Sequence, residues 1–385
     1  MTPPASTRQR RRRVAVITGT RAEYGLLRST LDAIDHHPRL QLQLVVTGMH
    51  LLGKFGHTVG DIVRDGRRIA ARVPMQKGSD AATDQALGLS RGIAGITRFL
   101  DRARTDIVLV LGDRIEALAG ALAAVTTDRL LAHIHGGDIA PGDFDDPVRH
   151  AITKLAHLHL TATRTSHRRV LRLGEEARRV HLVGAPGLDD LLQLGRVRSG
   201  TRTRTGEALI VQHACGRSPA HERRVMNMIL RAVADAGLQR AIIYPNTDRG
   251  HTGILQALEA HCTRSRGHEV NVWRSLPRET YLRKLLEVDV LVGNSSSGLL
   301  EAPVAGVPVV NIGPRQRGRE RAGPGILDAE ESYASIQRAL ARALRSRPRK
   351  TGRCPYGDGR AGRRIAALLA RVDLSAAFRR KGLTY

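Results

Sequence analysis

The sequence predicts an α/β protein made of two Rossmann-like parallel-sheet domains that face each other across a cleft. Short apolar runs alternate with helical patterns along the whole chain, which favours parallel sheets covered by helices on both faces. The chain has 385 residues, enough for two domains with separate cores. A Gly- and Pro-containing break near the middle marks the place where these domains would meet.

The apolar runs predict the strands of both sheets. Strands of the first half are expected at 14–18, 42–47, 106–111, 130–135, 157–161 and 180–183. Strands of the second half are expected at 207–212, 240–244, 269–273, 288–292 and 307–312. Amphipathic stretches between the runs, such as 22–35 and 114–125, are expected to form the covering helices.

The break after Val183 predicts the domain organisation. Gly-Ala-Pro-Gly follows this residue, and an Arg- and Thr-rich stretch at 196–205 comes soon after. We therefore expect a disordered basic tail at 1–13, a first domain at 14–185, a linker at 186–206, a second domain at 207–364, and a C-terminal helix in 365–385 that packs back on the first domain.

The net charge of +26 raises the possibility of a nucleic-acid partner. Only six of the 62 basic residues are Lys, however, a bias that points to genomic base composition rather than selection for phosphate contacts. Aromatic residues make up 3% of the chain, too few for base-stacking platforms. We expect a solvated Arg-rich surface and no specific nucleic acid.

Several protein classes do not fit this sequence. The three cysteines fit neither a disulfide framework nor a CxxC metal site, which favours a reducing, cytoplasmic location. No apolar stretch reaches the roughly 18 residues that span a membrane, and no apolar segment of a secretory signal follows the basic tail. Neither GxGxxG nor a Walker A motif occurs, so we expect no nicotinamide and no other cofactor.

The segment 290–319 predicts an anion-binding site. An apolar run ends in Gly-Asn-Ser-Ser-Ser-Gly, and the hydroxyls of Ser295 and Ser296 converge there with free backbone N–H groups of a helix start. Glu301 can accept hydrogen bonds from sugar hydroxyls. Arg315 follows the next strand, where α/β sheets place ligands. The alternative is a capped helix beside a solvated basic loop.

A second polar cluster follows two strands of the first half. Asp113 and Arg114 come after one strand, and the next ends in His-Ile-His135-Gly-Gly-Asp138, with Asp145 in the following loop. Crowded carboxylates raise each other's pKa toward neutrality, which suits proton transfer. The alternatives are turn or N-cap roles for single Asp residues, and zinc bound through the two His. No third ligand is set by the spacing, so no metal is expected.

Three further candidates also lie near strand ends. Arg21 is placed at the start of the first helix, where a guanidinium can face an anion across a cleft. His213 ends one strand of the second half, and Asn246 follows the next. Both side chains could contact a diphosphate, a base or a ribose. The alternative for each residue is a purely structural contact.

Together these motifs resemble the hydrolysing branch of the UDP-N-acetylglucosamine 2-epimerase family, which serves sialic-acid-type sugar synthesis. The matching segments are G-T-R-A-E-Y-G (19–25), T-G-M-H (47–50), F-G-H-T-V (55–59), L-G-D-R (111–114), H-I-H-G-G-D (133–138), 145–159, 183–191, Q-H (212–213), P-N-T-D (245–248), 293–303 and 311–319. The resemblance implies a GT-B-like fold, a homo-oligomer and conversion of UDP-N-acetylglucosamine and water to N-acetylmannosamine and UDP. The family reaction removes the C2 proton, eliminates UDP to leave a 2-acetamidoglucal, and then adds water.

The resemblance also implies roles for individual residues. Arg21, His213, Ser295, Ser296 and Arg315 would hold the diphosphate. Glu301 would bind the ribose hydroxyls, with Asn246 nearby. Asp113 and the acidic loop around Asp145 would supply the proton-transfer groups, and Arg114 would support them.

The chain departs from the family pattern at the H-G-G-D motif. Relatives generally have Glu in place of His135, or Glu in place of Asp138. Asp is one methylene shorter, and a misplacement of about 1 Å can cost about 100-fold in rate. A GDP-linked or C4-modified substrate, a non-hydrolysing epimerase and a weakly active binding protein therefore stay open. The non-hydrolysing branch typically has Pro where this chain has Ala22.

Overall fold

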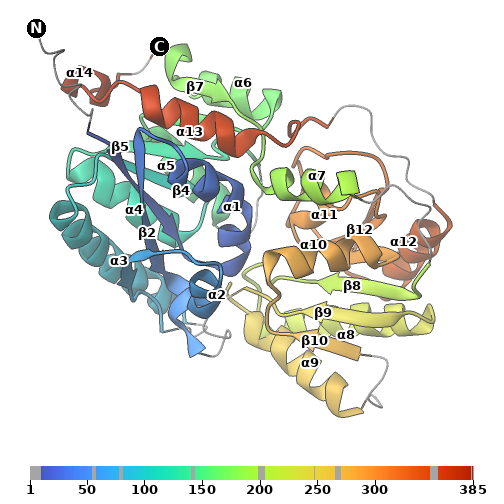
Figure 1. Ribbon diagram of the computed structural model, residues 1–385. Coiled ribbons are helices and arrows are strands. Elements are labelled where there is room, and N and C mark those ends of the chain that lie inside the picture. The colour runs from blue at the N-terminus through green and yellow to red at the C-terminus, as the bar shows by residue number, and fades with distance from the viewer. Residues whose placement is uncertain are drawn as a thin grey trace, which may run out of the picture.

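The computed structural model describes residues 10–53, 58–77, 81–139, 144–197, 204–246, 248–264, 270–346, 354–382 and 384. It contains two parallel sheets, with strand orders β3-β2-β1-β4-β5-β6-β7 and β10-β9-β8-β11-β12-β13. Figure 1 shows the two sheets in separate halves of the molecule, each with its covering helices. The predicted fold class is confirmed. We call each sheet with its helices the first and the second domain.

The first sheet places its two faces against different helices. Its strands are β1 (Arg12–Thr18), β2 (Leu40–Thr47), β3 (Ile69–Val73), β4 (Ile107–Leu111), β5 (Leu130–Ile134), β6 (Leu158–Thr161) and β7 (Val180–Leu182). Val14 and Val16 share a core with α1 (Arg21–Asp35) and α13 (Ala361–Arg371). Ala15 and Ile17 pack on the other side, against α3 (Ala82–Arg102), α4 (Ile115–Thr126) and α5 (Asp145–Leu155). Because alternate residues point to opposite faces, burial of both faces explains the continuous apolar runs.

The second sheet is built in the same way. Its strands are β8 (Glu207–Val211), β9 (Gln239–Ile243), β10 (Val270–Trp273), β11 (Val290–Gly293), β12 (Val309–Ile312) and β13 (Ile326–Ala329). Ala208 and Ile210 pack with α8 (Pro219–Asp235), α9 (His251–Arg264) and α12 (Tyr333–Arg345). Leu209 and Val211 face α7 (Gly187–Val197), α10 (Arg278–Glu287) and α11 (Ser297–Leu300).

Two strands were not predicted from the sequence, β3 and β13. Each lies at an edge of its sheet, where β3 pairs with β2 and β13 pairs with β12. In β3 the burial alternates along Ile-Ala-Ala-Arg-Val, so no continuous apolar run marks it. The strand predicted at 130–135 ends at Ile134, because His135 turns into the left-handed region with a φ of 64°.

Helices α7 and α13 connect the two halves. Residues 187–197 of the expected linker form α7, whose Leu188 and Leu191 lie in a core cluster of the second domain. Asp189 of α7 accepts hydrogen bonds from the backbone N–H groups of Ala361 and Gly362 at 3.1 and 2.8 Å, at the start of α13. Figure 1 shows α13 lying across the first domain beside α1. Residues 1–9 of the expected tail and 198–203 of the expected linker lie outside the described residues.

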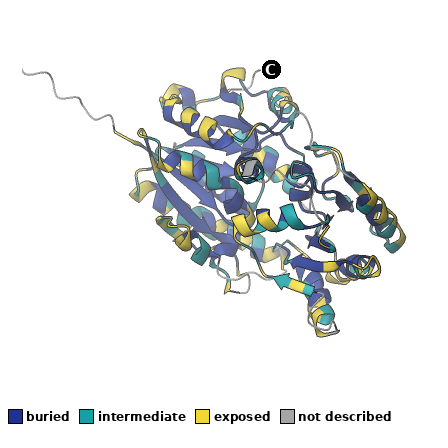
Figure 2. Ribbon diagram, turned by 45° about the vertical axis from the view of Figure 1, so that its right-hand side comes forward, coloured by how far each residue is buried: buried dark blue, intermediate teal, exposed yellow. Residues whose placement is uncertain are grey.

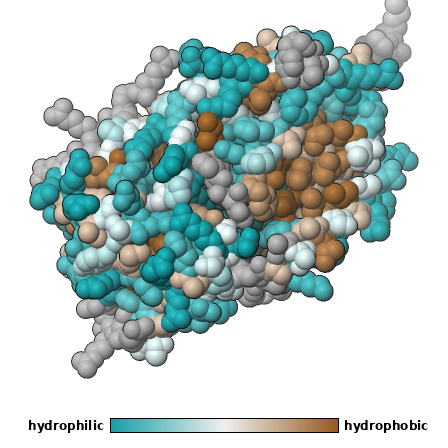
Figure 3. Space-filling view, turned by 180° about the vertical axis from the view of Figure 1, so that it is seen from behind, coloured by the Kyte–Doolittle hydropathy of each residue, from teal (hydrophilic) through white to brown (hydrophobic). Residues whose placement is uncertain are grey.

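The remaining helices have nine residues or fewer. They are α2 (Val59–Arg64), α6 (Arg164–Arg172), α14 (Ala376–Arg379) and the 3₁₀ turns η1 (Gly48–Leu51) and η3 (Ala177–Arg179). Figure 2 shows the strands buried and the exposed residues concentrated on the outer helices. Figure 3 shows hydrophobic side chains gathered on the back of the first domain, surrounded by hydrophilic ones. Within the described ranges, no helix is long and apolar enough to cross a membrane.

Candidate active site

A cavity of about 150 Å³ lies between the two domains, at the carboxyl ends of their strands. Ten of the sequence-predicted site residues line it: Asp113, Arg114, His135, Asp145, His213, Asn246, Ser295, Ser296, Glu301 and Arg315. The structure therefore brings together two groups that lie far apart in the sequence, the carboxylates after β4 and β5 and the Ser-rich turn after β11. Arg21 and Asp138 do not line this cavity.

His213 is held in one protonation state. Its Nδ1 accepts a hydrogen bond from the backbone N–H of Asn246 at 3.1 Å, so the neutral ring must carry its proton on Nε2. Burial, with a further effect from Arg315, lowers the pKa of His213 to about 3. The side chain is therefore a neutral hydrogen-bond donor at physiological pH, suited to a phosphate oxygen.

The Ser-rich turn depends on close backbone packing. Gly293 has a φ of 135°, and a Cβ there would lie 2.2 Å from the carbonyl oxygen of Val211. Asn294 then accepts a hydrogen bond from the backbone N–H of His213 at 2.7 Å, which ties the turn to β8. Because α11 is a single turn, hydroxyls and individual N–H groups contribute more here than a helix dipole does. The helix expected after this turn is present, but it is only four residues long.

Glu301 is buried and paired. Its carboxylate binds the guanidinium of Arg278, which also donates to the carbonyl oxygen of Gly187 at 2.6 Å. Arg278 lies on α10 and Gly187 begins α7, so two other segments hold this carboxylate in place. A second carboxylate oxygen stays available to accept hydrogen bonds from a ligand hydroxyl.

The carboxylates of the first domain surround a buried arginine. Arg149 of α5 is 2% exposed, pairs with Asp113 and donates to the carbonyl oxygen of His135 at 3.1 Å. Asp145 lies at the start of the same helix. Burial and the nearby charge of Asp113 raise the pKa of Asp145 to about 7. A carboxylate with this pKa can gain and lose a proton near neutral pH.

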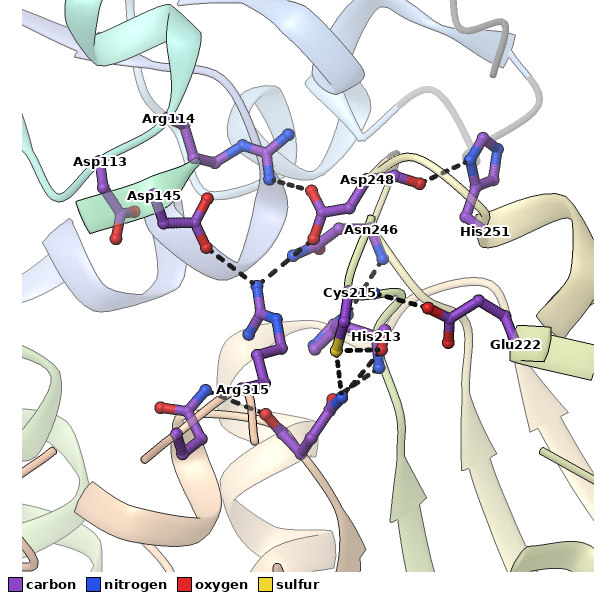
Figure 4. Close-up of polar contacts among 12 residues, drawn as sticks. Asp113, Arg114, Asp145, His213, Cys215, Glu222, Asn246, Asp248, His251 and Arg315 are labelled. Atoms are coloured by element: carbon purple, nitrogen blue, oxygen red, sulfur yellow. Dashed lines mark hydrogen bonds and ion pairs between the residues drawn. The ribbon is translucent and has the colours of Figure 1, made fainter. Parts of the chain in front are cut away.

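An ion-pair layer joins the two domains across the cavity. Asp248, from the loop after β9, binds Arg114 at 3.0 Å and Arg315 at 3.3 Å, and Arg315 also lies 3.7 Å from Asp145. Figure 4 shows Arg114 and Asp145 reaching this layer from the first domain and Arg315 from the second. A second cavity of about 220 Å³ shares Arg114, Asp145 and Arg315 with the first.

Asp138 was a candidate for the catalytic site, but its carboxylate is held by neighbouring side chains and does not line the cavity. Its Oδ2 lies 2.9 Å from His135 Nδ1, and its Oδ1 accepts a hydrogen bond from Ser166 at 2.6 Å. Arg319 lies 3.5 Å from the same carboxylate. Although burial opposes it, His135 and the arginines hold the pKa of Asp138 well below its usual range. The carboxylate is fixed in the wall of the site, behind His135.

Arg21, His133 and His135 each contact a partner within the first domain. Arg21 pairs with Asp61 at 2.6 Å, so its guanidinium is directed to α2 instead of the cavity. His133 Nε2 contacts the carbonyl oxygen of Gly112 at 2.7 Å, whereas His135 contacts Asp138, so the two imidazoles are not joined in one ligand set. In the part of the chain that the structure describes, no group of three or more His, Cys, Asp or Glu residues could hold a metal ion.

Three residues of the site were not identified from the sequence: Arg149, Asp248 and Arg278. The motifs D-D-P-V-R-H and P-N-T-D contain the first two, but nothing in the local pattern shows that their charges are buried against the cavity. Arg278 lies in an ordinary charged helix, and its partner Glu301 belongs to a different segment.

Comparison with known proteins places these features in a family. The model of the UDP-N-acetylglucosamine 2-epimerase family matches residues 32–370. A Legionella pneumophila protein named UDP-N,N'-diacetylbacillosamine 2-epimerase (hydrolyzing) is 33% identical over 370 residues, covering 94% of this chain and 97% of that protein. The UDP-N-acetylglucosamine 2-epimerase of Neisseria meningitidis is 33% identical over 342 residues, 86% of this chain and 87% of its own. In fold, the chain resembles the Methanocaldococcus jannaschii UDP-GlcNAc 2-epimerase in complex with UDP-GlcNAc and UDP, with a TM-score of 0.74, 16% identity and coverage of 93% and 99%.

Proposed function

Because the chain belongs to the UDP-N-acetylglucosamine 2-epimerase family, we propose that it is a hydrolysing 2-epimerase that converts UDP-N-acetylglucosamine and water to N-acetylmannosamine and UDP. The observation that carries the proposal is the shared cavity. It sets a carboxylate whose pKa is raised to about 7, Asp145, beside an arginine from the other domain, Arg315. The first can take a proton and the second can hold a leaving diphosphate.

The diphosphate-binding group in this proposal comes from the second domain. Arg315, the Ser295 and Ser296 turn and the Nε2–H of His213 offer positive charge and hydrogen-bond donors to phosphate oxygens. Glu301, held by Arg278, accepts hydrogen bonds from the ribose hydroxyls, and Asn246 lies on the same side. Arg21 is not in this group, because it pairs with Asp61 outside the cavity lining.

The first domain supplies the chemistry in this proposal. Asp145 takes the proton from C2 of the sugar, the bond between C1 and the UDP oxygen breaks, and UDP leaves with the electron pair as a C1=C2 double bond forms. Water then adds its oxygen to C1, and a proton returns to C2 on the opposite face. Asp113 holds Arg149 in place and keeps the pKa of Asp145 high, and Arg114 neutralises Asp248 beside the leaving group.

A second substrate has specific support. The match to the Legionella relative covers 97% of that protein, whose name specifies a hydrolysing enzyme. The name also specifies UDP-N,N'-diacetylbacillosamine as its substrate, a nucleotide sugar with a further N-acetyl group. The cavity of about 220 Å³ beyond the Arg114, Asp145 and Arg315 layer offers room for an added substituent. UDP-N,N'-diacetylbacillosamine is therefore our alternative substrate for the same reaction.

Product analysis tests the proposal. The purified protein is incubated in heavy water with each nucleotide sugar, with EDTA present, and the products are followed by NMR. We expect free 2-epimerised sugar with deuterium at C2, together with UDP, from one of the two substrates. A UDP-linked epimer would identify a non-hydrolysing enzyme, and binding without turnover would identify a nucleotide-sugar binding protein. The homo-oligomer and the cytoplasmic location expected from the sequence stay predictions.

A further inference from the structure

The H-G-G-D motif forms a dyad whose imidazole faces the cavity. His135 lines the cavity and Asp138 does not, although the sequence places both in one short turn. With Nδ1 of His135 bound to Asp138 at 2.9 Å, Nε2 is the ring nitrogen left for a ligand. This arrangement, an imidazole oriented by a buried carboxylate, is the usual way to fix a tautomer for proton transfer.

Resting on the proposed function, we propose that His135 is the acid that protonates C2 in the hydration half of the reaction, and that Asp138 is its positioning residue. Inversion at C2 requires the proton to leave one face and return on the other, so Asp145 alone is not sufficient. The carboxylate that the resemblance assigned to this motif thereby acts through an imidazole and does not reach the substrate.

The surrounding structure holds His135 in an uncommon conformation. Its φ of 64° is rare for a residue with a side chain, and such a conformation persists only where neighbours enforce it. Arg149 donates to its carbonyl oxygen at 3.1 Å. Gly137 allows the turn to approach α6 closely, because a Cβ there would lie 2.4 Å from the carbonyl oxygen of Ser166. Ser166 in turn donates to Asp138 at 2.6 Å.

The charges around His135 are of both signs. Asp138 comes from its own turn, and His133 lies two residues before it on β5. The paired Asp113 and Arg149 contribute from β4 and α5, Arg319 from the loop after β12 and Asp145 from the start of α5, all lining or adjoining the same cavity. The Nδ1 contact with Asp138 sets the ring orientation and leaves Nε2 facing the cavity.

The proton balance closes with this assignment. Asp145 takes the C2 proton in the elimination, and UDP leaves. The imidazolium of His135 then gives its proton to C2 of the glucal as a C–H bond forms, and positive charge develops at C1. Water bonds to C1 through oxygen and passes one proton to the now neutral His135. Asp145 releases its proton to solvent, so the net change is addition of water and release of UDP with one proton.

The variant His135→Asn separates the two halves of the reaction. Asn tolerates a positive φ, and its Nδ2 can replace Nδ1 as a donor to Asp138, but it carries no group in place of Nε2. We expect the variant to release UDP and 2-acetamidoglucal at a rate near that of the parent. Formation of C2-deuterated free sugar should fall about 10²- to 10⁴-fold. His135→Gly with added imidazole should regain hydration, which keeps the test valid if Asn disturbs the turn.

The variant Asp138→Asn tests the positioning role. The amide no longer offers Nδ1 a carboxylate to hold the ring, so formation of C2-deuterated sugar should fall while release of UDP and 2-acetamidoglucal stays near the parental rate, and Asp138→Glu should recover part of the loss. A parental ratio of free sugar to 2-acetamidoglucal in Asp138→Asn would overturn the role of Asp138. Parental rates of sugar formation in His135→Asn would overturn the role of His135, as would loss of UDP release together with hydration. If the parent protein releases no UDP from either nucleotide sugar, the proposed function fails and this assignment fails with it.

Discussion

Both domains bury titratable residues at the cavity, but burial shifts the pKa of these residues in opposite directions in the two domains. In the second domain, burial lowers the pKa of His213 from 6.5 to about 3, which removes it from the physiological range. In the first domain, burial raises the pKa of Asp145 from 3.8 to about 7, which moves it into that range. Burial favours the neutral form in both cases. The same physical effect thus makes an imidazole inert and a carboxylate responsive to pH.

This difference suggests how the work is divided. The second domain presents donors whose state does not change with pH, as a nucleotide-binding surface requires: a neutral imidazole, hydroxyls and an arginine. The first domain gathers carboxylates, and burial together with their mutual repulsion raises the pKa of Asp145 into the physiological range. Substitutions in one domain should therefore change the rate, and substitutions in the other should change the affinity for UDP.

The largest effect is expected from Asp113→Asn. The change removes a charge that holds Arg149 and raises the pKa of Asp145, while the shape of the side chain is kept. We expect turnover to fall about 10²- to 10⁴-fold, with the dissociation constant for UDP largely unchanged, as measured by steady-state kinetics and calorimetry.

Asp106→Asn is the matched control for this change. Asp106 lies just before β4 and pairs with Arg10 at 2.6 Å, at the opposite end of the strand that precedes Asp113. Its substitution should leave turnover unchanged. If Asp113→Asn weakened UDP binding as much as it lowered the rate, the division between the two domains would have to be given up.

A smaller effect, on binding, is expected from Arg315→Ala. A hydrogen bond to a charged group contributes about 1.5–3 kcal/mol, which corresponds to about 10- to 150-fold in the dissociation constant for UDP. Calorimetry with UDP measures it directly. Arg317→Ala is the control, because Arg317 lies two residues away, is exposed and does not line the cavity. Equal affinities in the parent and in Arg315→Ala would place the diphosphate elsewhere.

The fold was predictable because its central strands are marked locally. Strands such as β4 and β8 are buried along their whole length, and a run of consecutive apolar residues signals this without knowledge of the rest of the chain. Edge strands lack that signal. In β13 only Ile326 and Ala329 are buried in a four-residue strand, so nothing in the sequence separates it from a loop.

The site was predictable only in part, for a related reason. Residues that follow a strand can be placed at the sheet edge from sequence, and this rule located Asp113, His213 and Ser295. Pairing between distant segments has no local signature. Arg114 and Asp248 are 134 residues apart, and the partner of Arg21 could not be inferred either. The left-handed turn at His135, which moves Asp138 behind the imidazole, follows from contacts with α5 and α6.

The smallest expected effect comes from Asp248, which belongs to the second domain but acts on the first. Asp145 must be ionised to take a proton, so with its pKa raised to about 7 the rate should fall about tenfold for each pH unit below that value. Asp248 raises the pKa of Asp145, and it also competes for Arg315, which lowers it. Asp248→Asn removes both effects, and both removals lower the pKa of Asp145.

The acid limb of the profile of kcat/KM against pH should therefore move to lower pH in Asp248→Asn, by about half to one unit, where one unit corresponds to about 1.4 kcal/mol. Asp101→Asn is the control, because the Asp101 side chain is 84% exposed and should leave the profile unchanged. A shift to higher pH would mean that Asp248 mainly holds Arg315 in reach of Asp145. In that case the ion-pair layer would serve to assemble the two domains, and the proton affinity of the first domain would be set by Asp113 and burial alone.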